Sequence, residues 1–107
     1  MSFQTEARYL KKKSPSPFSI WRFDWPCTVI SSKKILRIEV LSTATVHWSV
    51  ENWKTSSDSD TKDTGLGLHI ADIGLANVDS DVIEFTFFWK ETCQWENRDF
   101  VVKIIKA

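Results

Sequence analysis

Glycine, proline and cysteine are all scarce in this chain, which has three glycines, three prolines and two cysteines among its 107 residues. Three glycines could hardly build a phosphate-binding loop. The two cysteines, Cys27 and Cys93, belong to no CxxC pair and no His/Cys cluster, which argues against a zinc site and leaves open whether they pair. No apolar run approaches the roughly 18 residues of a membrane span, and no signal segment opens the chain. We therefore expect no membrane partner and, for the chain as it stands, a cytosolic location, although a longer parent enzyme could be exported.

Neither sign of charge is in excess, because 14 basic and 14 acidic side chains give a formal net charge of zero. Such a chain has no long-range field with which to attract nucleic acid. Its one basic run, Lys11-Lys12-Lys13, lies in a polar stretch that continues into Ser14-Pro15-Ser16-Pro17. We expect residues 1–17 to be a flexible tail or linker in which these lysines are solvated.

The rest of the chain is dominated by short β-rich runs with turn residues between them. These runs cover residues 18–23, 35–40, 45–49, 68–73, 82–89 and 100–105. Two longer polar connections, 54–64 and 90–99, are expected to be loops. The pattern predicts one all-β domain over residues 18–107, an immunoglobulin-like antiparallel β-sandwich.

Six tryptophans in a domain this small are the most unusual feature of the composition. Trp48 and Trp89 stand in apolar strand context and are expected in the core, whereas Trp21 could be core or surface. Trp53 and Trp95 lie in polar segments, where surface function and packing both remain open.

The sequence offers no recognisable catalytic machinery. Asp58, Asp60 and Asp63 are close together, but acid–base catalysis needs opposed carboxylates and a desolvated partner, which a Ser/Asp loop does not provide. The same stretch lacks the glycine and closing glutamate of a calcium loop. No GxSxG nucleophile motif occurs. We expect a non-catalytic chain that needs no cofactor or metal.

Tryptophans interleaved with planar polar residues suit a neutral ligand such as a sugar. Aromatic rings stack on the apolar faces of sugars, and nearby polar side chains orient the hydroxyls. The segments 46–54 and 94–98 both have this composition.

These two segments resemble those of starch-binding modules. His47-Trp48-Ser49…Asn52-Trp53 resembles a stretch of the family-25 and family-26 carbohydrate-binding modules, immunoglobulin-like sandwiches that bind α-1,4-glucans; Asn52 stands where glycine is usual. Trp95-Glu96-Asn97-Arg98 is similar to the Trp-Asp-Asn-Asn loop of those modules and to the stretch before the last strand of the glucoamylase starch-binding domain.

A wider resemblance extends over residues 18–105, to the C-terminal domain of bacterial glucoamylase-type glycoside hydrolases. It rests on the order and spacing of several short motifs: Trp21-Arg22-Phe23, Leu36-Arg37-Ile38-Glu39, Val46-His47-Trp48-Ser49, Asp63-Thr64-Gly65-Leu66-Gly67, Phe85-Thr86-Phe87 and Trp95-Glu96…Arg98-Asp99-Phe100. That domain accompanies an α/α catalytic barrel, which this chain lacks. The family's catalytic carboxylates therefore have no counterpart here.

The resemblance implies a platform of Trp53 and Trp95, with His47 as a third face or hydrogen-bonding group. Asn97 and Lys54 would bind sugar hydroxyls, and Asp63–Gly67 would form a turn. The implied function is a non-catalytic accessory module that binds an α-glucan such as starch, glycogen or a maltooligosaccharide. The alternative is a structural or interaction sandwich whose exposed tryptophans pack against a catalytic domain without binding sugar.

Overall fold

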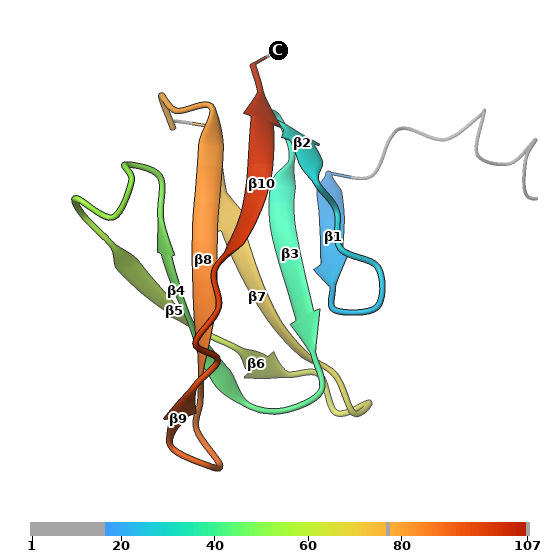
Figure 1. Cartoon of the computed structure of the whole chain (residues 1–107). Coiled ribbons are helices and arrows are strands. Elements are labelled where there is room, and N and C mark those ends of the chain that lie inside the picture. Colours follow the sequence, from blue (N-terminus) through green and yellow to red (C-terminus); the bar gives the residue numbers. More distant parts are fainter. Residues whose placement is uncertain (1–16, 77, 107) are drawn as a thin grey trace, which may run out of the picture.

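The computed structural model describes residues 17–76 and 78–106, which form β-strands and connections but no helix (Figure 1). The predicted tail, apart from Pro17, lies outside the described residues. Within the described ranges, no helix is long and apolar enough to cross a membrane. The strands are β1 (Phe18–Arg22), β2 (Val29–Ser31), β3 (Ile35–Val40), β4 (Ala44–Ser49), β5 (Ser57–Asp60), β6 (Lys62–Asp63), β7 (His69–Gly74), β8 (Val82–Trp89), β9 (Gln94–Trp95) and β10 (Phe100–Ile105).

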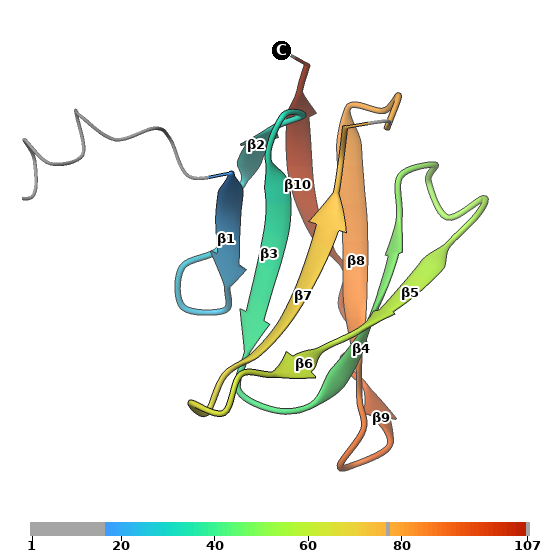
Figure 2. The ribbon, with the colours of Figure 1, turned by 180° about the vertical axis from the view of Figure 1, so that it is seen from behind.

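The strands form two sheets packed face to face. One sheet has the order β1-β3-β7-β6, and the other has the order β2-β10-β8-β4-β5, with β9 paired to β8. Figures 1 and 2, which view the molecule from opposite sides, show these sheets as two layers. The all-β, single-domain sandwich predicted from the sequence is confirmed.

The core lies between the sheets and follows from the alternation within the long strands. Because successive side chains of a strand point to opposite faces, every second residue is directed inward. The fully buried residues of two facing strands are Leu36, Ile38 and Val40 of β3 and Ile83, Phe85 and Phe87 of β8. Trp21 of β1 joins this core, with its ring edge-on to Phe85 at a centroid distance of 5.1 Å. Trp48 and Trp89 are half-buried and pack against the core.

Two strand pairs are parallel rather than antiparallel, namely β1 with β3 and β2 with β10. The cause is the path of the chain between β1 and β3. It reverses direction at the turn closed by mutual backbone hydrogen bonds of Arg22 and Trp25, and again at residues 32–34 before β3. Two reversals leave β1 and β3 pointing the same way.

The polar connections predicted as loops contain short strands, so that part of the prediction is wrong. β5 and β6 lie within residues 54–64, and β9 lies within residues 90–99. Serine and aspartate are poor strand formers, and neither segment has an apolar face that would reveal it in the sequence. Their conformation comes from pairing with neighbours: β5 pairs with β4 from Thr45↔Asp60 to Trp48↔Ser57.

The predicted turn at Asp63–Gly67 is present between β6 and β7. Gly65 and Gly67 have φ values of 82° and 84°, a region that side chains disfavour. The Asp63 carboxylate accepts a hydrogen bond from the Gly65 N–H at 2.8 Å. The Thr64 N–H and hydroxyl both donate to the Leu68 carbonyl oxygen at 2.9 Å, which closes the turn.

The two cysteines are free thiols. Cys27 is half-buried against the core, and this burial raises the pKa of its thiol. Cys93 is exposed, in the turn between β8 and β9. The pairing that the sequence left open is therefore absent.

Candidate functional site

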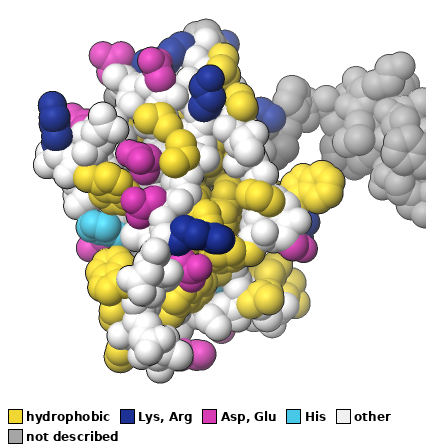
Figure 3. Space-filling model, in the orientation of Figure 1, with side chains coloured by type: hydrophobic (Ala, Val, Ile, Leu, Met, Phe, Trp, Pro, Cys, Tyr) yellow, Lys and Arg dark blue, Asp and Glu magenta, His cyan; other side chains and the backbone are white. Residues whose placement is uncertain are grey.

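Three of the five predicted site residues meet on the outer surface of the sheet that contains β4 and β8. His47 stacks on Trp53 with a centroid distance of 5.4 Å and an interplanar angle of 15°. Its ring also meets the Trp95 ring at 5.6 Å and 73°. We call these three residues the aromatic patch. Figure 3 shows hydrophobic side chains gathered beside a histidine on this face.

The three rings form a corner and do not lie in one plane. Trp53 is nearly parallel to His47, whereas Trp95 stands at a steep angle to it. The planes of the two indoles are consequently far from parallel. A ligand at the patch would meet rings whose planes are turned relative to one another.

The strand register of β4 sets the position of His47. Val46 is fully buried, so the next side chain along the strand points outward. His47 lies opposite Thr86 of β8 and Asp58 of β5, and its Nδ1 is 2.5 Å from Asp58 Oδ1. An ionised carboxylate accepts but cannot donate, so Nδ1 donates to it. Nε2 makes no hydrogen bond within the described residues, which leaves it for a ligand.

A buried hydroxyl group holds Trp53 in place after β4. The Ser49 Oγ accepts hydrogen bonds from the N–H groups of Trp53 at 3.0 Å and Glu51 at 3.1 Å. Asn52 and Trp53 both adopt positive φ, at 56° and 65°. Asparagine tolerates this region better than most side chains, so Asn52 is compatible with a position where glycine would be unstrained.

Trp95 is held at the surface by its pairing with β8 and by the segment that follows it. It is 48% exposed, and its ring packs edge-on against Phe88 at 5.1 Å. Downstream, the Glu96 N–H donates to a carbonyl oxygen of β8 at 2.8 Å. The Thr86 hydroxyl donates to the Arg98 carbonyl oxygen, also at 2.8 Å. These bonds fix the chain on both sides of Asn97.

Backbone strain in the described residues is concentrated in the two connections that carry the patch. The non-glycine residues with positive φ are Asn52 and Trp53 in one connection and Cys93 and Asn97 in the other. Such conformations cost on the order of 1–3 kcal/mol each and tend to cluster at functional sites.

The other two predicted site residues, Lys54 and Asn97, are exposed neighbours of the patch along the sequence. Neither side chain makes a hydrogen bond or an ion pair within the part of the chain that the structure describes. The structure thus brings together His47, Trp53 and Trp95 and leaves Lys54 and Asn97 unengaged at their flanks.

The acidic residues beside the patch were missed as site residues. Asp58 and Asp60 alternate along β5, opposite His47 and Thr45, so they share the outward face. The hydrogen bond from the Thr45 hydroxyl at 2.7 Å lowers the pKa of Asp60, and Lys90 at 3.1 Å adds to the effect. No local pattern in the sequence indicates these contacts, because they exist only once β5 pairs with β4.

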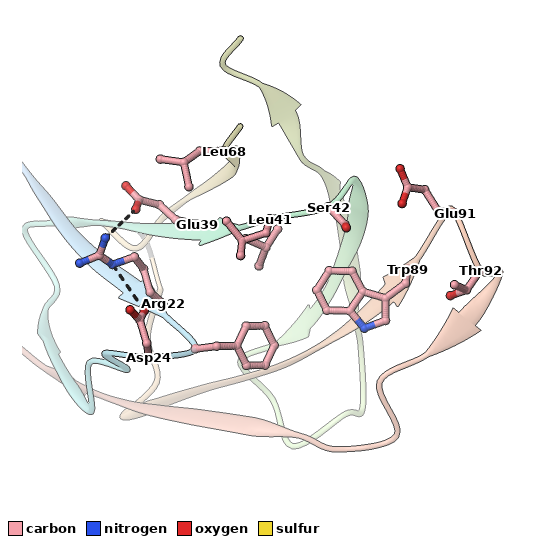
Figure 4. Close-up of a pocket in the computed structure, with 11 residues that line it drawn as sticks. Arg22, Asp24, Glu39, Leu41, Ser42, Leu68, Trp89, Glu91 and Thr92 are labelled. Carbon is pink, nitrogen blue, oxygen red and sulfur yellow. Dashed lines mark ion pairs between the residues drawn. The ribbon is translucent and has the colours of Figure 1, made fainter. Parts of the chain in front are cut away.

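A second feature that sequence reasoning missed is a cleft at one end of the sandwich, which we call the end cleft. It has a volume of about 660 Å³ and lies where β1, β3 and β8 end (Figure 4). Its apolar lining includes Phe23, Leu41 and Trp89, and its charged lining includes Arg22 and Glu39.

Comparison of the chain with family models, curated proteins and solved structures finds no match to any of them.

Proposed function

We propose that this chain is a non-catalytic carbohydrate-binding module that binds an α-glucan such as starch, glycogen or a maltooligosaccharide, as the accessory domain of a glycoside hydrolase. The observation that carries the proposal is the corner of aromatic rings around His47, with Trp95 48% exposed. Indole faces provide apolar contact for the C–H faces of sugar rings, which is the main source of affinity for a neutral glycan.

The angle between the rings favours a curved glycan. In an α-1,4-linked chain successive glucose units turn, so their apolar faces point in different directions. A flat β-1,4-linked chain presents its faces in one plane and suits coplanar rings. Trp95 at 73° to His47, with Trp53 parallel to His47, matches the turning chain.

Polar groups around the corner would orient the sugar hydroxyls. His47 Nε2 has no protein partner among the described residues, because Nδ1 engages Asp58. The side chains of Lys54 and Asn97, which follow the two tryptophans closely in sequence, also make no hydrogen bond or ion pair with residues 17–76 and 78–106. Amide, imidazole and ammonium groups together supply the donors and acceptors that hydroxyls need.

The carboxylates beside the patch support a binding role more than a catalytic one. Asp58 is hydrogen-bonded to His47, and Asp60 to Thr45 and Lys90. Both carboxylates are exposed, whereas a general acid needs a desolvated carboxyl group with a raised pKa. The pKa of Asp60 is lowered, which is the opposite direction.

Isothermal titration with maltoheptaose tests the proposal. We expect a dissociation constant on the order of 10⁻⁵ to 10⁻³ M, about −4 to −7 kcal/mol. Trp95→Ala and Trp53→Ala should remove most of the heat. Trp25→Ala is the matched control, because Trp25 is 74% exposed but lies outside the patch. No heat for the unaltered chain, and no retardation on starch-containing gels, would refute sugar binding; equal heats with a cello-oligosaccharide would refute the preference for α-glucans.

The alternative function, an interaction sandwich that packs against a catalytic domain, is favoured by other exposed apolar side chains. Trp25 is 74% exposed and Leu66 is 84% exposed. If they form an interface, the isolated chain should self-associate at high concentration, and Trp25→Ser with Leu66→Ser should abolish this in sedimentation experiments. A strictly monomeric chain would count against the alternative.

A further inference from the structure

The end cleft has the size and lining of a binding site, yet the aromatic patch does not use it. Its volume of about 660 Å³ lies within the range of roughly 300–1,000 Å³ that is usual for ligand sites. Phe23 and Trp89 both line it, and their ring centroids are 6.1 Å apart. Figure 4 shows Trp89 beside Leu41 and Ser42 in the cleft. Leu41, which also lines the cleft, is 79% exposed. These side chains leave an apolar surface open to solvent.

The charges of the end cleft are predominantly negative. Three acidic residues line the cleft, Asp24, Glu39 and Glu91, whereas Arg22 is the one basic residue in the described lining. Arg22 lies 3.9 Å from Asp24 and 3.8 Å from Glu39, so it offsets part of their charge. Glu91 is exposed and has no ion pair within the described residues. The complement of such a cleft is an apolar group flanked by positive charges.

One segment of the chain outside the described residues has this chemistry. Residues 8–13 read Arg-Tyr-Leu-Lys-Lys-Lys, an aromatic and an aliphatic side chain between basic ones. We propose that this segment occupies the end cleft of its own molecule. The aromatic and aliphatic side chains of this segment match the apolar lining of the cleft in chemistry, and its basic side chains match the carboxylates.

The length of the chain allows this contact. The carbonyl oxygen of Pro17 accepts a hydrogen bond from the Ile35 N–H at 2.8 Å, which fixes the start of β1. The cleft lies past the other end of β1, five strand residues away, or roughly 17 Å at the usual rise of a strand. Six extended residues span roughly 20 Å, so Lys11 can reach the cleft from Pro17. Tyr9 and Leu10 are farther from Pro17 along the chain, so the stretch of chain that links them to Pro17 is longer than the distance requires.

Methyl NMR spectra of the full chain test the proposal. Leu41 and Leu68 line the end cleft and report on its occupancy. We expect their methyl signals to move when Lys11, Lys12 and Lys13 are all changed to glutamate, because the reversed charges release the segment. Leu10→Ser should move the same signals in the same direction.

The matched control is the pair Lys33→Glu and Lys34→Glu, which reverses two charges in the turn before β3 and should leave the Leu41 and Leu68 signals unchanged. Glu91→Lys in the background of the three glutamates should restore part of the original signal positions, because it reverses one charge of the cleft. This rescue separates docking from a general effect of charge on the fold.

Two outcomes would overturn the proposal. If Leu41 and Leu68 give the same signals in the original chain and in the chain with three glutamates, the segment does not occupy the cleft. If the signals change on dilution of the original chain, the occupant comes from a second molecule. Maltoheptaose binding is measured on the same samples, so that loss of the aromatic patch and loss of the docked segment are told apart.

Discussion

The hydroxyl of Ser49 is the contact on which the aromatic patch depends most, and its removal gives the sharpest test. The side chain is buried at 2% exposure, and its Oγ accepts the N–H groups of Glu51 and Trp53. Ser49→Ala deletes this acceptor while changing little of the side-chain volume. Two backbone donors then lose their partner at the point where the chain enters the left-handed region.

The expected destabilisation follows from those two bonds. A neutral hydrogen bond contributes about 1 kcal/mol, so the pair contributes about 2 kcal/mol. For a domain of this size each kcal/mol corresponds to roughly 4–8 °C in Tm, which gives a decrease of about 8–16 °C. Trp53, at φ 65°, loses the bond that holds its conformation, so the affinity for maltoheptaose should fall as well.

Thermal unfolding followed by circular dichroism measures the Tm, and titration measures the affinity. Ser49→Thr is the matched control for affinity, because it keeps the oxygen that accepts the two N–H groups, so it should retain sugar affinity even if its added methyl group, at a position that is 2% exposed, lowers the Tm. An unchanged Tm for Ser49→Ala would refute the reasoning. A lowered Tm with unchanged sugar affinity would show that Trp53 does not depend on this hydroxyl.

Three further predictions concern single groups. Hydrogen bonding from Thr45 lowers the pKa of Asp60, so its stabilising contribution is complete above the ordinary carboxyl value of 3.8 and is lost as the pH falls through the lowered pKa; a carboxyl NMR titration with a midpoint at or above 3.8 would contradict this. Burial raises the pKa of the Cys27 thiol, so iodoacetamide at mildly alkaline pH should modify Cys93 first, as judged by peptide mass spectrometry. Gly65→Ala places a side chain at φ 82° and should lower the free energy of unfolding in urea by about 1–2 kcal/mol.

The chain offers controls for two of these. Gly74→Ala should have a much smaller effect than Gly65→Ala, since neither added Cβ meets an atom within 4 Å and only Gly65 has positive φ. Equal losses would remove the argument from backbone conformation. Lys90→Met should raise the pKa of Asp60 toward its ordinary value by removing the neighbouring ammonium group.

The long strands could be predicted from the sequence because each carries its own signal. In β3, Leu36 and Ile38 alternate with Arg37, and this pattern requires one buried face whatever the partner strand is. β5 has no such pattern, and its four residues are Ser-Asp-Ser-Asp. Its strand conformation depends on pairing with β4, and the residues of β5 alone do not indicate that pairing. The parallel pairing of β1 has the same origin, since it depends on two turns and not on β1 itself.

The candidate site was predictable in its composition and not in its geometry. Aromatic residues in polar segments pointed to Trp53 and Trp95, and strand alternation placed His47 outward. The steep angle between the rings depends on how two separate connections leave the sheet. Asp58 joins the site only through the register of β4 and β5. The end cleft is formed by residues from distant parts of the sequence, so no local sequence pattern predicts it.

The composition of β5 has a consequence for the behaviour of the protein in solution. An outermost strand exposes a row of backbone groups with which another molecule could pair. Here β5, the edge strand of its sheet, carries Asp58 and Asp60. The chain continues directly into β6, the edge strand of the other sheet, which consists of Lys62 and Asp63. Two copies that approached each other along these borders would bring like carboxylates together and would repel. The segment least suited by composition to form a strand thus disfavours pairing with another molecule along the β5 and β6 edges.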